Sequence, residues 1–313
     1  MTAPGPPGAG RGPASVPAPP MRIGIVAHPA KPRAVELARQ ARLRLARSAE
    51  VLLTPETAAA LGGTEPAEPL ETLRADVLVA FGGDGTFLMA LKHSDLPLLP
   101  VNAGTVGFLA EVDGDRPDQL AGALDRLLAG QYRLEPRMRI AAEIEGRRVA
   151  EAVNEVVIHT SQVAKMRLFE IAVDGVPTGR VRADGVLVAT PTGSTSYSLS
   201  AGGPIVDPSL EAIVVSSLAP FRSPARSVVL DPFRTVGVQL VLPDKEGVVV
   251  VDGQTEEMVP AGGRVLCHRS PRAATFVRFG RPYFRRLQGT QILPWQDPAG
   301  PSPSDGSDLP PAP

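Results

Sequence analysis

A run of apolar residues that ends in a glycine-rich turn constrains the fold of this chain more than any other feature. No polar residue interrupts Val77 to Phe81, and such a run is typical of a parallel strand that is covered on both faces. The glycines after it let a ligand approach the main chain closely, and the stretch from Phe87 to Leu91 has the composition of a helix. Free N–H groups and the positive end of a helix dipole would face the ligand here, so we predict a phosphate site. Its residues are Gly82, Gly83, Asp84, Gly85 and Thr86.

Asp84 is the unexpected member of this turn, because a carboxylate repels bound phosphate. It fits such a site if it serves a hydroxyl nucleophile or helps to hold a metal ion. A structural alternative is that Asp84 only caps the following helix, since Asp is a good capping residue and Gly a good turn residue. Turns of this sequence occur in several kinds of phosphotransferase, so residues 82–86 predict a reaction class and leave the substrate open.

Composition limits the compartment and the partners. The chain has 313 residues and 43% hydrophobic content, enough for two domains with their own cores, and no apolar run is long enough to span a membrane. A formal net charge of -1 argues against a general nucleic-acid-binding or anionic-membrane surface. The single cysteine, Cys267, excludes an internal disulfide and a multi-cysteine metal site, so we expect a buried thiol in a reducing, cytoplasmic location.

The histidines show no spacing that suits a metal site, and we predict no metal ligands from the protein. They are His28, His93, His159 and His268. We interpret them as structural residues, and His28, in the loop after the first strand, is the one on the phosphate side of the fold.

The sequence pattern changes once between two ends that are rich in Pro and Gly. These ends cannot bury enough apolar surface to order themselves. Met21 opens the first patterned segment, and we hypothesise that translation starts there. We predict a disordered extension over 1–20, an α/β domain with the glycine turn over 21–137, a mainly-β domain over 138–273, a segment over 274–293 that returns to the first domain, and a disordered tail over 294–313.

The first domain alternates apolar strands with helix-like stretches, which predicts a doubly wound, mostly parallel sheet. The expected strands are 23–27, 51–53, 77–81 and 98–101, and the expected helices lie near 35–46, 87–92 and 118–128. In the second domain the segments are shorter and rich in Val, Ile and Thr, which favours strands. Turn signals separate these segments at 145–146, 174–175, 246–247 and 262–263.

Three further segments could complete a site around the glycine turn. Asn102 to Glu111 places more glycines beside a strand end. Asn154 and Glu155 interrupt a strand-like stretch, where one exposed and one tolerated polar residue would be the structural alternative. Residues 190–204, TPTGSTSYSLSAGGP, carry more hydroxyl groups than a core or a helix cap needs, so we predict a polar, planar ligand there.

In this order the motifs resemble those of the NAD kinases, which phosphorylate the 2′-hydroxyl of the adenosine ribose of NAD to give NADP. The matching segments are GGDGT at 82–86, NAGTVGFL at 102–109, NE at 154–155, DGVLVATPTGSTSYSLSAGGP at 184–204 and VDGQ at 251–254. The resemblance runs from about Met21 to Leu293. It departs from the family at Ser196, where alanine is usual, and over 216–230, a looser version of a segment with Pro and His.

The resemblance implies a role for each matching residue. Asp84 would be the general base or would orient the 2′-hydroxyl, Gly85 would line the same pocket, and Asn154 and Glu155 would hold the ribose hydroxyls. Tyr197 would pack on the adenine ring, with the hydroxyls of Thr195 and Ser200 at its polar edge. The whole adenine pocket would comprise Thr195, Ser196, Tyr197, Ser198, Leu199 and Ser200. Further NAD contacts are implied for Lys165, Arg182, Asp184, Ala219 and Gln254, some from a neighbouring subunit, although Lys165 and Arg182 could also be solvated surface charges.

The implied enzyme binds NAD and ATP in the cleft between its domains and forms a homo-oligomer, a dimer or tetramer. Mg²⁺ or another divalent cation would bind mainly through the nucleotide phosphates. Another triphosphate or polyphosphate stays open as the donor. Two alternatives compete: a lipid or sphingoid-base kinase with the same turn, which would need a long apolar groove, and a catalytically silent NAD-binding regulator, against which Asp84 in an intact turn argues.

Overall fold

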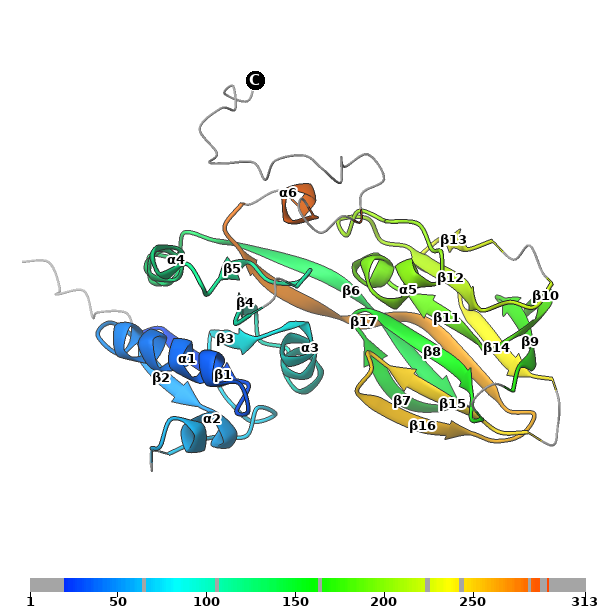
Figure 1. Ribbon diagram of the computed structural model, residues 1–313, viewed down its shortest axis with the longest axis horizontal. Coiled ribbons are helices and arrows are strands. Elements are labelled where there is room, and N and C mark those ends of the chain that lie inside the picture. The colour runs from blue at the N-terminus through cyan, green and yellow to red at the C-terminus, as the bar shows by residue number, and fades with distance from the viewer. Residues whose placement is uncertain are drawn as a thin grey trace, which may run out of the picture.

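The computed structural model describes residues 20–63, 66–104, 107–162, 165–222, 226–241, 245–280, 283–287 and 292. The predictions for the N-terminal extension up to residue 19 and for the tail from residue 294 lie outside these residues. Within the described residues, an α/β region and a β-rich region stand side by side, and long strands run from one into the other (Figure 1).

The first region is a parallel sheet with helices on both faces. Its elements are β1 (Arg22–Ala27), α1 (Pro32–Leu45), β2 (Glu50–Leu53), α2 (Pro55–Ala60), β3 (Val77–Gly82), α3 (Asp84–His93), β4 (Leu98–Asn102), β5 (Val112–Asp113) and α4 (Pro117–Leu128). The strands pair in parallel in the order β2–β1–β3–β4. The predicted doubly wound sheet and its expected strands and helices are confirmed, whereas α2 and β5 were missed.

The long helices α1 and α4 of this region each begin with a proline, and each buries one face. Pro32 and Pro117 occupy the first turns of α1 and α4, where the missing N–H costs nothing and the fixed φ favours a helix. The buried side chains of α1 recur at helical spacing, and they are Ala34, Leu37, Ala38, Ala41 and Leu45. This periodicity made the helix predictable from the sequence.

The buried strand β3 shows why its sequence contains no polar residue. Val77, Val79 and Phe81 belong to the core with α1 and α4, whereas Leu78 and Ala80 pack with α3 on the opposite face. Every residue of β3 is buried. The glycine turn that follows therefore emerges from a strand held on both sides, at the carboxyl edge of the sheet, where ligands bind in folds of this kind.

The second region consists of two packed sheets and confirms the predicted mainly-β character. Its strands are β6 (Arg133–Ile144), β7 (Arg147–Ala152), β8 (Glu155–Thr160), β9 (Arg167–Val173), β10 (Val176–Ala183), β11 (Gly185–Ala189), β12 (Ile213–Leu218), β13 (Val228–Leu230), β14 (Val236–Leu240), β15 (Gly247–Val251), β16 (Thr255–Val259) and β17 (Arg264–Arg278). One sheet has the order β13–β12–β11–β8–β15–β16. Its inner side chains, such as Ile158 and Val188, share a core with Ile140, Phe169 and Val238 of the other sheet.

Strand β17 joins the two regions. It pairs antiparallel with β14 and β6, and Phe276 near its end pairs in parallel with Leu98 of β4. One eleven-stranded sheet therefore passes through both regions, and β6 and β17 are visible as the long ribbons between them (Figure 1). The predicted return of the segment from residue 274 to the first domain is confirmed, because Ala274 and Phe276 at the end of β17, a strand of 15 residues, share a core with Leu78 and Phe87. Helix α6 (Tyr283–Leu287) follows, and the domain boundaries stay a prediction.

Candidate active site

The glycine turn connects β3 directly to α3. Gly83 is the N-cap of the helix and Asp84 its first residue, so Asp84 is not the capping residue of the structural alternative. A Cβ at Gly82 would lie 2.3 Å from Oγ1 of the buried Thr86, whereas a Cβ at Gly85 would meet nothing within 4 Å. Gly82 is therefore required by packing within the turn, and the space above Gly85 is open to a ligand.

The Asp84 carboxylate is bound to a loop from the next motif. The backbone N–H of Phe108 donates to Oδ2 at 2.9 Å, and the N–H of Leu109 donates to Oδ1 at 3.3 Å. A Cβ at Gly107 would lie 2.2 Å from Oδ1, so only glycine fits there. Burial raises the pKa of Asp84, and the two N–H groups oppose that rise. The segment after Asn102 thus supports the carboxylate, a role that the sequence analysis did not assign to Gly107.

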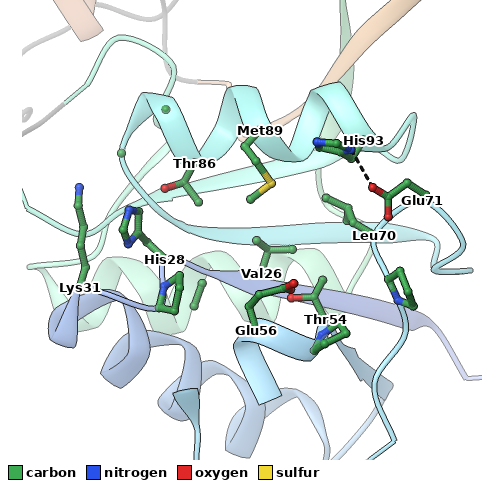
Figure 2. A pocket seen from close by; sticks show the side chains of 16 residues that line it. Val26, His28, Lys31, Thr54, Glu56, Leu70, Glu71, Thr86, Met89 and His93 are labelled. Atoms are coloured by element: carbon green, nitrogen blue, oxygen red, sulfur yellow. Dashed lines mark ion pairs between the residues drawn. The ribbon is translucent and has the colours of Figure 1, made fainter. Parts of the chain in front are cut away.

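A cavity of about 690 Å³ lies beside the turn (Figure 2). Gly83, Gly85 and Thr86 line it together with His28 and Lys31 of the loop before α1. Val26, Leu70 and Met89 add apolar walls, and an ion pair of 2.8 Å between His93 Nδ1 and Glu71 Oε1 lies at the far end of α3 (Figure 2).

Lys31 is a charged residue of this cavity that the sequence analysis missed. Its Nζ is 3.6 Å from the place where a Cβ on Gly83 would stand. The sequence signal that could have identified Lys31 was its position directly before Pro32, where α1 begins. Neighbouring His28, predicted on the phosphate side, lines the cavity with a buried Nδ1 that has no hydrogen-bond partner among the described residues.

Gln254 links the glycine turn to the β-rich region. Its Nε2 donates to the carbonyl oxygen of Gly85 at 2.9 Å. Two residues earlier, the half-buried Asp252 accepts the N–H groups of Val153, Asn154 and Glu155 at 2.7, 2.8 and 3.0 Å. The sequence analysis quoted the VDGQ motif but gave Asp252 no role, although a carboxylate in a motif of the candidate site was a usable signal.

Asn154 and Glu155 are both buried, with 8% and 7% exposure, so the alternative of one exposed polar residue does not describe them. The carbonyl oxygen of Asn154 accepts the N–H of Thr190 at 2.9 Å, and a Cβ at Gly193 would lie 2.1 Å from that oxygen. Ser196 Oγ donates to Glu155 Oε1 at 3.3 Å. These contacts bring the NE motif and the hydroxyl-rich segment together.

Glu155 has a strongly raised pKa. Burial, followed by the nearby Asp252 carboxylate, raises the pKa of Glu155 to about 8, against hydrogen bonds from the Ser196 hydroxyl and the Tyr197 backbone. Burial also raises the pKa of Asp252, which its three N–H donors oppose. Glu155 Oε2 has no hydrogen-bond partner among the described residues and is therefore available to a ligand hydroxyl.

The hydroxyl-rich segment forms a 3-10 helix, η1 (Thr192–Thr195), and a short helix, α5 (Tyr197–Ser200). Some of its hydroxyls serve the fold: Thr190 donates to Val153, Ser194 to Pro191 and Thr195 to Thr192. These three hydroxyls donate their protons to backbone oxygens, so only their acceptor lone pairs could serve a ligand. Tyr197 is 44% exposed, Ser200 is exposed and Leu199 is half-buried, while the buried Ser198 hydroxyl lacks a partner among the described residues.

The remaining predicted residues lie at the other end of β11. Thr190 follows this strand and Asp184 precedes it, so about 20 Å of extended chain separates them. The N–H of Asp184 donates to Leu218, next to Ala219, and the Arg182 guanidinium lies 5.7 Å from the centre of the Phe221 ring. Lys165 and Ala219 are exposed. No contact among the described residues connects this group to the glycine turn.

The described part of the chain contains no group of three or more His, Cys, Asp or Glu residues arranged to hold a metal ion. None of its helices combines the length and apolar character that a membrane span needs.

Comparisons with known proteins agree with this arrangement. The family description "ATP-NAD kinase N-terminal domain" matches residues 23–132, and "ATP-NAD kinase C-terminal domain" matches residues 153–279. The NAD kinase of Methanothermobacter thermautotrophicus is 38% identical over 273 residues, covering 86% of this chain and 95% of that protein. The NAD kinase of Pyrococcus furiosus is 41% identical over 219 residues, 69% of this chain and 78% of that protein.

Solved structures show the same fold. An NAD kinase from Archaeoglobus fulgidus in complex with ATP aligns with a TM-score of 0.70 at 30% identity and covers 85% of this chain and 97% of its own. Yeast NADH kinase in complex with NADH aligns with a TM-score of 0.79 over 90% and 91% of the chains, at 23% identity. Both halves of the chain therefore match one family of phosphotransferases in sequence and in fold, and the chain belongs to the NAD kinase family.

Proposed function

We propose that this protein transfers the terminal phosphate of ATP to the 2′-hydroxyl of the adenosine ribose of NAD, giving NADP. One observation carries the proposal: hydrogen bonds connect the phosphate turn to the segments predicted to hold ribose and adenine. Gln254 donates to Gly85, and Asp252, which stands two residues before Gln254 in the chain, accepts the N–H groups of Asn154 and Glu155. Phosphoryl transfer asks a protein mainly for position and charge neutralisation, which such a connected site supplies.

The acceptor would lie on the Asp84 side of the turn. Asp84 would orient the 2′-hydroxyl or take its proton, and the raised pKa of this carboxyl favours proton uptake. Asn154 and Glu155 would hold the ribose hydroxyls. Tyr197, which is exposed beside Glu155, would pack on adenine.

The donor would occupy the cavity beside the turn. Its phosphates would lie at the N-terminus of α3 beside Lys31, whose charge attracts them, and its base would contact the apolar walls at Val26, Leu70 and Met89. Another triphosphate or polyphosphate would use the same phosphate positions.

Mg²⁺ would enter with the nucleotide. The described residues offer no protein cluster for it, which fits a cation that keeps its waters and binds phosphate oxygens. When bound, it would neutralise charge on the transferred phosphate.

The second group of predicted residues would act in a homo-oligomer. Lys165, Arg182, Asp184 and Ala219 lie at the end of β11 away from the turn, and some of them would contact NAD in the site of a neighbouring subunit. We propose a dimer or tetramer in which each site is completed in this way. The proposed location is the cytoplasm, where the buried thiol of Cys267 would stay reduced.

A coupled assay tests the proposed reaction. The protein is incubated with Mg²⁺, ATP and NAD, and NADP is detected with an NADP-specific dehydrogenase. 2′-Deoxy-NAD should bind without being phosphorylated, because it lacks the acceptor hydroxyl. A phosphorylated product from 2′-deoxy-NAD would contradict the assigned acceptor, and an absence of NADP with every donor tested would contradict the proposed activity.

A further inference from the structure

A second cavity lies away from the glycine turn, where α3 meets β7 and β17. Its volume is about 510 Å³. The residues that line it are Lys92, Arg139, Arg148, Val149, Ala150, Glu151, Thr255, Pro271 and Arg272. Among these lining residues four are cationic and one is a carboxylate, so the cavity carries an excess of positive charge. None of them belongs to the site proposed above.

Arg139 is the central residue of this cavity. It lies on β6 with 1% exposure. Its Nη1 donates to the carbonyl oxygen of Leu91 in α3 at 2.8 Å, but Nε and Nη2 have no hydrogen-bond partner among the described residues. A buried guanidinium that leaves N–H groups unsatisfied is costly, and a bound acceptor would remove that cost.

The carboxylates near Arg139 do not satisfy it. Asp95 Oδ1 lies 3.6 Å from Nη2, and Glu151 Oε2 lies 3.8 Å from Nη1, both too far for a good hydrogen bond. Arg272 forms ion pairs with the same two carboxylates, at 2.6 Å from Asp95 Oδ1 and 3.2 Å from Glu151 Oε2. Burial and the Arg272 charge lower the pKa of Arg139, against the opposing effect of the Glu151, Asp95 and Asp252 carboxylates.

The opening of the cavity adds two exposed cations. Arg148, on β7, pairs with Glu151 and lies 3.3 Å from Ser270 Oγ, with 46% of its side chain exposed. Lys92, in the last turn of α3, is exposed. Guanidinium groups bind phosphate through paired N–H donors, and an ammonium group adds a point charge. The cavity thus combines a buried guanidinium group with exposed cations at its opening.

We propose that this cavity is a second anion site, which binds a small phosphate-bearing molecule through Arg139, Arg148, Arg272 and Lys92. A multiply charged phosphate group suits four cations better than a single carboxylate would, and the volume admits a small phosphate ester as well as inorganic pyrophosphate. The ligand would contact α3 of the α/β region and β7 of the β-rich region at once.

Pyrophosphate serves as the probe ligand, and hydrogen exchange of the backbone amides shows where it binds. In metal-free buffer, pyrophosphate should protect backbone amides of residues 147–152 and 268–272. Protection confined to residues 28–31 and 82–87 would place the probe at the glycine turn and overturn the proposal, as would an absence of binding. A phosphate ester such as glycerol phosphate, tested in the same way, distinguishes an organic ligand from the inorganic ion.

Variants separate this site from the catalytic one. Lys92→Gln combined with Arg148→Gln removes only exposed charges and should weaken pyrophosphate binding by about 10-fold, the size expected for lost charge-assisted hydrogen bonds. Arg147→Gln is the matched control, because Arg147 precedes Arg148 on β7 but pairs with Glu257 at 3.0 Å outside the cavity. Equal affinity in the double variant and the control would overturn the proposal.

Arg139→Met removes the buried guanidinium group and should abolish pyrophosphate binding at residues 147–152. If this variant does not fold, the result for the double variant Lys92→Gln with Arg148→Gln tests the proposal. NAD phosphorylation without pyrophosphate is measured in parallel. Loss of pyrophosphate binding with normal NAD phosphorylation supports the second site, whereas an inactive wild-type protein that still binds pyrophosphate contradicts only the proposed reaction.

Discussion

Residues that match the NAD kinase motifs lie at both ends of β11, but the two groups differ in burial and in their hydrogen bonds. At the Thr190 end, Asn154 and Glu155 are buried and tied by hydrogen bonds to neighbouring motifs. At the Asp184 end, Lys165, Arg182 and Ala219 are exposed and make no described contact with the glycine turn. In the proposed function, the first group holds the acceptor within one chain and the second group contacts NAD in a neighbouring subunit. Changes at the first end should act on chemistry and stability, and changes at the second on binding in the oligomer.

The largest effect is expected from Asp84→Asn. The amide keeps the size of the side chain but cannot accept the proton of the 2′-hydroxyl, so turnover should fall roughly 10²-fold or more. Steady-state assays give kcat, and calorimetry should show nearly unchanged NAD affinity. Asp118→Asn, an exposed change in α4, serves as the control. Near-normal turnover in Asp84→Asn would remove this residue from the mechanism.

Asp252→Asn should have the next largest effect. An amide nitrogen would face one of the three N–H groups that Asp252 now accepts, which disturbs the position of Asn154 and Glu155. We expect kcat/KM to fall about 10-fold and the free energy of unfolding to drop by about 1–3 kcal/mol. Asp231→Asn is the control, since Asp231 accepts one N–H, that of Phe233, in an exposed turn. Equal losses in both variants would show that Asp252 has no special role.

Arg182→Gln probes the Asp184 end of β11. The side chain is exposed, so the free energy of unfolding should change by less than about 0.5 kcal/mol. If a neighbouring subunit uses Arg182, the KM for NAD should rise a few-fold, about the effect of one partly exposed charged contact, while kcat stays the same. Arg180→Gln, two residues earlier on β10 and paired with Glu170 at 2.7 Å, is the control. An unchanged KM would mean that Arg182 is a solvated surface charge.

A further effect concerns pH and Glu155. The carboxyl has a pKa of about 8 in the folded protein and about 4.5 when unfolded, so the folded state holds the extra proton between these values. Stability should therefore fall as pH rises from about 5 to 8, and Glu155→Gln should remove this part of the fall. Thermal unfolding at pH 5.5 and at pH 8 measures this effect. The Tm difference between the variant and the wild type should shift by a few degrees in favour of the variant at pH 8. A constant Tm difference would contradict the raised pKa.

The sequence predicted the α/β region well, because its signals are local. β3 is apolar throughout because it faces a core on each side, and α1 repeats its buried residues at helical spacing. The turn signals at 145–146 and 174–175 were also reliable, since Glu145, Gly146, Asp174 and Gly175 all have positive φ. Cys267 is buried as predicted, and burial raises the pKa of its thiol to about 12, which makes it unreactive.

Other features could not be predicted, because they depend on residues far apart in the chain. β17 contains Ser270, Pro271 and Arg272 near its middle, where the register shifts, so the sequence does not look like one long strand. Lys31 and Asp252 act through backbone or cavity contacts that no local pattern records. The helix α2 has only six residues, too few for a clear periodicity.

The sequence by itself indicated the family, the glycine turn and the residues to examine, because ordered motifs and local periodicity can be recognised in the sequence alone. Only the tertiary structure decided how the motifs meet. It showed Asp84 held by the 107–109 loop, Gln254 and Asp252 connecting the turn to Asn154 and Glu155, and the Asp184 end of β11 lying apart. It also placed Arg139 in a cavity that no motif marks. The physical reason is that burial, pKa shifts and unsatisfied donors arise from packing between distant segments.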